Sequence, residues 1–286
     1  MKHNEEGRYA NLLFVLLGLI MYVCFLFLDL MSKSIIMSRN IKFSIILLCF
    51  CYALIQKNSA GKGIIFCSKI ALLFTLISDL FLLILDYYTL GVITFIIVQQ
   101  LYGVRLMLEE CYNQLVKQET SWKEIDKKGN KDYAMTKGSN LLKQADNNKI
   151  GKLLLRKLSY RILVQAAITL VIVIVLLLSH VTLDGLLLVS IFYFICIVTN
   201  TISAVKAALN LPRNRSSVIF AMGMVLFLLC DINVGLYNLS GFIVMPDGLA
   251  TFASSVSAIL MWAFYAPSQL LITLSICYHK DNRMAE

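Results

Sequence analysis

Apolar runs long enough to cross a lipid bilayer recur along this chain and restrict what it can fold into. A membrane-spanning helix needs about 20 mostly apolar residues. The second run is short and lies between Lys42 and Lys57, but its centre, "IILLCFCYALI", is too apolar to remain in water. We therefore predict an all-α, polytopic membrane protein with eight transmembrane helices. The predicted spans are residues 10–30, 41–56, 64–86, 89–108, 159–179, 183–207, 217–237 and 251–277.

The distribution of Lys and Arg between these runs predicts how the protein is oriented, because cytoplasmic connections carry the excess of positive charge. Bases such as Lys57, Arg213 and Lys280 follow the second, sixth and eighth runs, whereas the connections after the third, fifth and seventh runs contain none. The connection between the first two runs departs from the pattern, since Lys33, Arg39 and Lys42 lie there. We predict an integral, multi-pass membrane protein with both termini in the cytoplasm.

Net charge and cysteine content exclude several other classes of protein. The net charge of +9 fits the topological asymmetry, and no folded basic module with interleaved aromatic residues is present, so no nucleic-acid partner is expected. The eight cysteines are small apolar packing residues in or near the runs, and none of their spacings resembles a zinc site. We expect no metal and no cofactor.

A long polar segment, residues 109–158, separates a first membrane half, residues 1–108, from a second, residues 159–286. It is rich in Lys, Asn, Gln and acidic residues, and we interpret it as a solvated, partly helical cytoplasmic linker. Alternatively, its end, "KIGKLLLRKLSYR", forms a base-rich amphipathic helix that lies on anionic lipid headgroups.

Two aspartates lie inside apolar runs and are the best candidates for function. Asp79 interrupts "LFTLISDLFLLILDYYT", and Asp231 interrupts "MVLFLLCDINVGLYN". An ionisable residue at this depth is costly and marks a functional site, although a protonated Asp can also serve only to bond a neighbouring helix. Both lie in the outer half of spans that run in the same direction, and each is followed seven residues later by a polar residue, Asp86 or Asn238.

The matched positions suggest two four-helix halves that each offer one Asp to a shared cavity. Two carboxyl groups in one buried site do not both ionise readily, so that one can act as an acid while the other remains an anion. Polar residues on the same and the following spans are candidates to bind substrate there: Gln99, Gln100, Tyr102, Asn233, Asn238, Tyr265 and Gln269.

The segments around these aspartates, "SDLFLLILDYYTLGVITFIIVQQLYGVRL" and "FAMGMVLFLLCDINVGLYNLS…WAFYAPSQLLITLSI", resemble the paired signatures of the YhhN-like, or lysoplasmalogenase, family of membrane proteins. The resemblance implies eight spans and hydrolysis of the vinyl-ether bond of lysoplasmalogens, with Asp79 and Asp231 as the catalytic pair. Family members often have a His at the position of Gln99, and their connection corresponding to residues 109–158 is usually short.

This activity suits an acid pair, because protonation of a vinyl ether gives an oxocarbenium ion that water converts to an aldehyde and an alcohol. It implies a lysophospholipid or ether-lipid substrate in contact with membrane lipids. The alternative is a proton-coupled transporter or lipid-binding membrane protein that uses the same Asp pair. In a third interpretation, a sensor acting through residues 109–158, the aspartates are dispensable.

Overall fold

The computed structural model describes residues 2–31, 34–56, 62–126, 138–179, 183–212, 214–238 and 246–278, and the side chains of all of these except 2–8, 62, 114–126, 138–150 and 247. Three of the bases on which the orientation rests, Lys57, Arg213 and Lys280, lie outside the described residues, as do both chain termini. The cytoplasmic location of the termini therefore stays a prediction.

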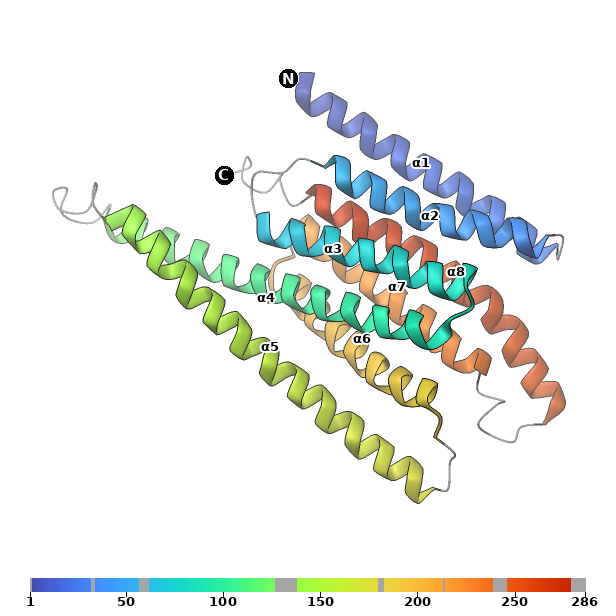
Figure 1. The fold of residues 1–286 in the computed structure, drawn as a ribbon. Helices are drawn as coiled ribbons and strands as arrows, with labels where there is room; N and C mark the ends of the chain where they lie inside the picture. The colour runs from blue at the N-terminus through green and yellow to red at the C-terminus, as the bar shows by residue number, and fades with distance from the viewer. Residues whose placement is uncertain are drawn as a thin grey trace.

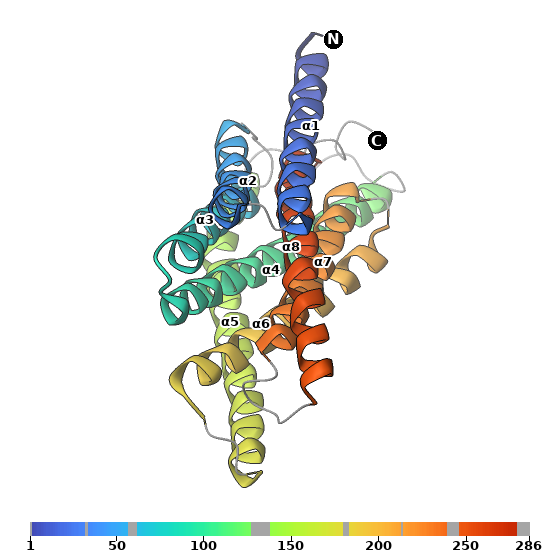
Figure 2. The same ribbon diagram turned by 90° about the vertical axis from the view of Figure 1, so that its right-hand side faces the viewer.

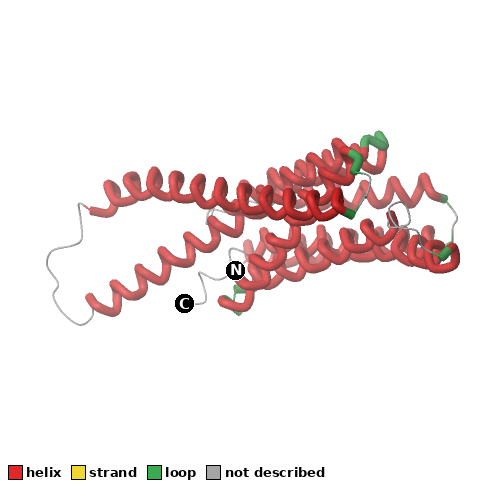
Figure 3. The backbone as a smooth tube through the Cα atoms, turned by 90° about the horizontal axis from the view of Figure 1, so that it is seen from below, coloured by secondary structure: helices red, strands yellow, loops and turns green. Residues whose placement is uncertain are grey.

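The described chain is helical throughout apart from short connections (Figure 3). Every long helix contains a segment that is long and apolar enough to cross a membrane, which confirms the eight predicted spans. The helices are α1 (Lys2–Leu30), α2 (Ile35–Ile55), α3 (Lys62–Asp79), α4 (Tyr88–Asp126), α5 (Gly138–Leu178), α6 (Gly185–Asn210), α7 (Arg215–Asn238) and α8 (Asp247–Tyr278), and a π-helical turn, η1 (Leu80–Ile84), follows α3.

The polar segment between the membrane halves differs from the expectation at both of its ends. The apolar part of α4 continues to Asn113, past the predicted end at residue 108, and α5 is one unbroken helix that enters its apolar part at Gly151. The segment "KIGKLLLRKLSYR" is thus continuous with the fifth span rather than a separate helix, and its location on the headgroups stays a prediction. Residues 127–137 lie outside the described part.

The helices form one bundle in which the two sequence halves share interfaces (Figures 1 and 2). The most extensive contact joins α7 to α8, followed by α3 to α4 and α4 to α6. Helix α8 also packs against α1 and α2 from the first half, so the halves are not separate four-helix bundles. Figure 1 shows the start of α1, the end of α8 and the junction side of α4 and α5 at the same end of the bundle, as an even number of spans requires.

Close packing of α7 on α8 depends on a glycine. A Cβ atom at Gly223 would lie only 3.1 Å from the backbone nitrogen of Ile272 and 3.1 Å from the carbonyl oxygen of Ser268. Small residues allow membrane helices to approach in this way, because van der Waals packing rather than the hydrophobic effect holds them together. The interface matters for function because α7 and α8 each contribute to the candidate site.

An ion pair explains part of the excess of bases in the connection between the first two spans, which departs from the orientation pattern. The Nζ atom of Lys42, on α2, lies 2.7 Å from Oδ2 of Asp29, on α1, and 4.7 Å from the ring centroid of Trp262, on α8. The Lys42 side chain is only 11% exposed. Its charge is therefore neutralised inside the bundle, and Lys42 does not count as a free loop base in the topology.

Candidate functional site

Asp79 is the last residue of α3, and its side chain faces the bundle interior. It is 2% exposed, and the hydroxyl of Tyr265, on α8, donates a hydrogen bond of 2.7 Å to its Oδ2 atom. Next to it, the Ser78 hydroxyl donates to Oγ1 of Thr94, on α4, at 2.7 Å. Helices α4 and α8 thus hold the end of α3 through polar contacts, which explains how an acidic residue is accommodated within an apolar span.

The chain changes its helical geometry immediately after Asp79. Residues Leu80–Ile84 form the π-helical turn η1, and Asp86 then adopts a left-handed conformation with φ of 56°. The first turns of α4 pack tightly against η1, since a Cβ atom at Gly91 would lie 2.5 Å from the Leu82 side chain. π-Helical turns are frequent at functional sites, and this one fixes the position at which α3 ends relative to α4.

Asp231 lies within α7, about two turns before that helix ends, and is partly exposed. The hydroxyl of Tyr193, on α6, donates a hydrogen bond of 2.7 Å to its Oδ2 atom. Each aspartate therefore has one tyrosine partner from a different helix. The neighbouring Cys230 thiol is buried and near enough to both Asp79 and Asp231 to interact with each electrostatically.

The two Asp–Tyr pairs meet around one group of rings, which we call the aromatic cluster: Phe95, Tyr193, Phe227, Trp262 and Tyr265. The ring of Phe95, on α4, lies 5.9 Å from that of Tyr193 and 6.4 Å from that of Tyr265. Phe227 is 5.5 Å from Tyr265 on another side, and Trp262 is 5.4 Å from it, edge to face. The structure thus brings both aspartates to one aromatic region.

Matched depth of the two aspartates would suit direct packing of the third span against the seventh, which the structure does not show. Helices α3 and α7 are not among the helix pairs that pack together over the described residues, and α3 instead contacts α4 and α8 while α7 contacts α6 and α8. Among the described residues, Asp79 and Asp231 each accept a hydrogen bond from a tyrosine and not from each other. Matched depth along two spans did not reveal which helices each aspartate contacts.

The two glutamines predicted to bind substrate are engaged in contacts between helices. Asn200, on α6, donates through Nδ2 to both the side-chain oxygen and the backbone oxygen of Gln99, each at 2.7 Å. Gln100 donates through Nε2 to Gln165 of α5 at 3.0 Å and lies 3.2 Å from the Cys196 sulfur. Both side chains therefore tie α4 to its neighbours, and the oxygen of Gln99 is already occupied.

The remaining predicted substrate-binding residues are dispersed. Tyr102 and Gln269 are fully buried, on α4 and α8, and each keeps an oxygen without a hydrogen-bond partner among the described residues. Asn233 and Asn238 donate to the backbone of their own helix, α7, at 2.8 Å, and Asn238 is exposed. Of this set, Tyr265 alone bonds one of the aspartates, and Gln99 approaches the Tyr193 hydroxyl that bonds the other.

Two buried charged residues on α4 escaped the sequence analysis. Arg105 is 1% exposed, donates to the Ser275 hydroxyl at 2.8 Å and lies 3.8 Å from the Phe220 ring centroid. Glu109, one turn later and 2% exposed, accepts from the Ser217 hydroxyl. The i, i+4 spacing of these opposite charges places them on one helix face and could have revealed them. The predicted boundary at residue 108 separated the two residues, because it placed Glu109 in the polar linker.

A second missed group lies between α5 and α6. Arg161 donates to the side-chain oxygen of Asn200, and Gln165 donates to the Thr199 hydroxyl at 2.7 Å. Arg161 was read as part of a base-rich surface segment, and Asn200 had no signal beyond being a polar residue in an apolar run. Together with Gln99 and Gln100 they form a polar connection across α4, α5 and α6.

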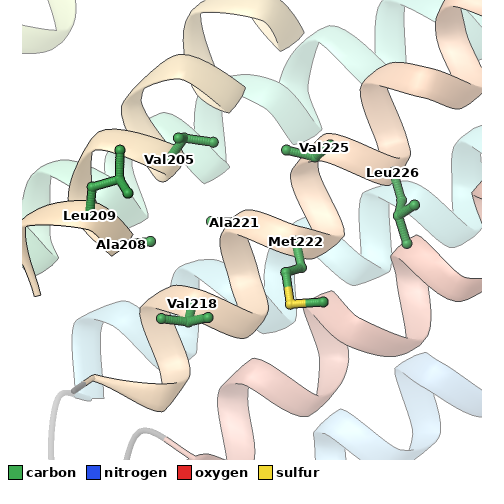
Figure 4. A pocket seen from close by; sticks show the side chains of 8 residues that line it. All are labelled: Val205, Ala208, Leu209, Val218, Ala221, Met222, Val225 and Leu226. Carbon is green, nitrogen blue, oxygen red and sulfur yellow. The ribbon is translucent and has the colours of Figure 1, made fainter. Parts of the chain in front are cut away.

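An apolar hollow on the bundle surface lies away from both aspartates. It is formed by α6 and α7 and lined by Val205, Ala208, Leu209, Val218, Ala221, Met222, Val225 and Leu226 (Figure 4). With no polar side chain along its wall, it offers a contact for hydrocarbon and no group for chemistry. Within the described ranges, no three His, Cys, Asp or Glu side chains are grouped as metal ligands would be.

Comparison of the chain with models of known protein families, with curated proteins and with solved structures finds no match.

Proposed function

We propose that the protein is a membrane hydrolase that cleaves the vinyl-ether bond of lysoplasmalogens, with Asp79 and Asp231 as its acid and base. The observation that carries the proposal is the meeting of two intramembrane Asp–Tyr pairs at one aromatic cluster. Intramembrane carboxyl groups are costly to retain for packing alone. The resemblance of the segments around them to the lysoplasmalogenase family supports the same activity.

The proposed reaction needs an acid, a water molecule and stabilisation of a cation. The acid protonates the alkene carbon remote from the ether oxygen, which leaves an oxocarbenium ion. A water molecule adds to the cationic carbon and returns a proton to the ionised carboxylate, and the resulting hemiacetal collapses to a fatty aldehyde and a glycerophospho-base. Paired carboxylates perform an equivalent task in glycoside hydrolysis.

The surroundings of the pairs suit this intermediate. Faces of aromatic rings attract cations, and the attraction is stronger where water is excluded. Phe95 and Phe227 lie within 6 Å of each other and are 6% and 1% exposed, so that part of the aromatic cluster is dry. A single-chain lipid would arrive through the membrane, where the outward faces of the helices are apolar.

The direct test is to incubate the purified protein in detergent with choline and ethanolamine lysoplasmalogens and to measure free aldehyde. We expect aldehyde release by the native chain and at least about 100-fold less by Asp79→Asn, the lower range of what a positioned acid contributes. Glu110→Gln is a matched control, since Glu110 is an exposed carboxylate on α4 paired with Lys157. Absence of aldehyde with both headgroups would refute the hydrolase.

A proton-coupled transporter remains the second candidate because of the polar connection across α4, α5 and α6. Side chains that hydrogen-bond inside a bilayer are typical of proton relays, and Gln99, Asn200 and Arg161 extend such contacts beyond the site of Asp231. Reconstituted vesicles with a pH-sensitive dye inside separate the two. Protein-dependent, substrate-stimulated proton flux without aldehyde release would favour the transporter.

A further inference from the structure

A chain of four side chains leads from α5 to Asp231. Arg161 donates from Nη2 to Oδ1 of Asn200, and Asn200 donates from Nδ2 to Oε1 of Gln99 at 2.7 Å. At the other end, the Tyr193 hydroxyl donates to Oδ2 of Asp231 at 2.7 Å. Between them, the Gln99 side chain lies near enough to the Tyr193 hydroxyl to interact with it, and its Nε2 atom has no hydrogen-bond partner among the described residues.

Arg161, the first residue in this chain of side chains, determines in which direction the hydrogen bonds are donated. A guanidinium group can only donate, so Asn200 must turn its oxygen to Arg161 and its NH₂ group to Gln99. Gln99 must then accept with its oxygen, which directs its NH₂ group to the Tyr193 hydroxyl. Amide oxygen and nitrogen are ordinarily hard to tell apart, but here the donor-only end decides both orientations. The hydrogen bonds from Arg161 to Asn200, from Asn200 to Gln99 and from Tyr193 to Asp231 all point toward Asp231, and the unpartnered NH₂ group of Gln99 is the donor available between them.

The fold holds Arg161 in the place that this requires. A Cβ atom at Gly103, on α4, would lie 2.4 Å from Nη1 of Arg161 and 2.7 Å from its Cζ atom, so that only glycine leaves room for the guanidinium. On α6, the same Nη2 atom is 3.5 Å from the Thr199 hydroxyl, which Gln165 also contacts. Arg161 is therefore enclosed by α4 and α6 rather than extended into the headgroup region.

The other aspartate has a different environment. Its partner Tyr265 is surrounded by the rings of Phe95, Phe227 and Trp262, and no amide chain reaches its hydroxyl within the described part of the chain. Asp79 is 2% exposed, whereas Asp231 is partly exposed. Donors aligned toward a carboxyl group stabilise its ionised form, and a dry ring of aromatic side chains does not.

We infer that Arg161 is a positioning residue which, through Asn200, Gln99 and Tyr193, holds Asp231 as the anionic member of the aspartate pair. Asp79 is then the member that carries the proton, and this second step, which assigns the acid of the reaction, rests on the proposed function. The titratable groups that face Asp231 place no second charge beside it. They are Tyr193 from α6 and Cys230 from α7 itself, and both are buried and neutral unless deprotonated.

Infrared difference spectroscopy on the purified protein in lipid nanodiscs at neutral pH tests the inference without any substrate. Subtracting Asp231→Asn from the native chain should remove a carboxylate stretch, and subtracting Asp79→Asn should remove the C=O stretch of a protonated carboxyl. When the same Asp231→Asn subtraction is made in an Arg161→Met background, the lost band should be the protonated C=O stretch. Gly103→Ala, which displaces the guanidinium and keeps its charge, should act in the same direction.

Arg156→Met is the matched control, because Arg156 is an exposed base on the same helix and lies outside the chain of hydrogen bonds. It should leave the Asp231 carboxylate band in place, as should Arg161→Lys if it retains the donor-only contact. A carboxylate band that survives in both Arg161→Met and Gly103→Ala, or that Arg156→Met removes equally, would overturn the inference. If the bands behave as expected but the native chain releases no aldehyde, the positioning role stands and only the hydrolase is refuted.

Discussion

Replacement of Gly223 by alanine is expected to weaken the contact between α7 and α8 that holds the candidate site. The added Cβ atom would meet backbone atoms of α8 at 3.1 Å on two sides, and a side-chain carbon of Ile272 at 2.8 Å. Ordinary carbon contacts lie at about 3.5–4.0 Å, so α8 must move by a few tenths of an ångström. Side chains can rotate away, but the backbone nitrogen of Ile272 and the oxygen of Ser268 can yield only if the helices separate.

The size of the effect follows from two opposed contributions. Overpacking of a well-packed interface costs about 1–3 kcal/mol, whereas Gly to Ala in a helix interior gains about 0.5–1 kcal/mol. The difference of these ranges is a loss of about 0–2.5 kcal/mol in the free energy of unfolding, centred near about 1 kcal/mol. Since Ser268 lies one turn from Tyr265 on α8, the shift should also lengthen the bond to Asp79 and lower any activity of the site.

Thermal unfolding in detergent, followed by circular dichroism at matched protein and detergent concentrations, measures the change. Gly235→Ala is the control on the same helix, because a Cβ atom there would meet nothing within 4 Å. It should raise the unfolding temperature slightly, whereas Gly223→Ala should lower it by a few degrees. Equal shifts of the two variants would show that the close approach of α7 to α8 is not limiting and would refute the packing argument.

Three further outcomes are expected. Asp79→Asn and Asp231→Asn should each lower vinyl-ether turnover by at least about 100-fold, and the double variant should be scarcely slower than the poorer single variant, because the two act as a unit; additive losses in single-turnover measurements would contradict this. Tyr265→Phe leaves a buried carboxyl without its donor and should cost about 1–3 kcal/mol of stability, whereas Tyr237→Phe, at an exposed position, should cost little; similar melting curves would count against the Asp–Tyr bond. Replacing residues 115–150 by a short Gly/Ser bridge should preserve membrane insertion and aldehyde release, since the segment contains no span, and a chain that failed to insert would show that it has a structural role.

The eight spans could be predicted from the sequence because hydropathy is a local property. A run of about 20 apolar residues has to cross the hydrocarbon as a helix whatever its neighbours do, since its backbone polar groups have no other partners there. The same reasoning identified Asp79 and Asp231, because a carboxyl group in such a run is costly wherever it faces. The predicted boundary at residue 108 was wrong for the corresponding reason, since Glu109 resembles a soluble residue until its partners are known.

Which residues meet inside the bundle was decided by the tertiary structure. Helix packing, and not depth along the span, joined Asp79 to Tyr265 and Asp231 to Tyr193, because α4, α6 and α8 pack around the ends of α3 and α7. Gln99 was chosen for its polarity, but only the rotation of α4 against α6 shows that its oxygen is occupied by Asn200. The sequence determines the position of a side chain along its helix. Its hydrogen-bond partner depends on how each helix is rotated and which neighbouring helix covers it, and no local sequence pattern determines either.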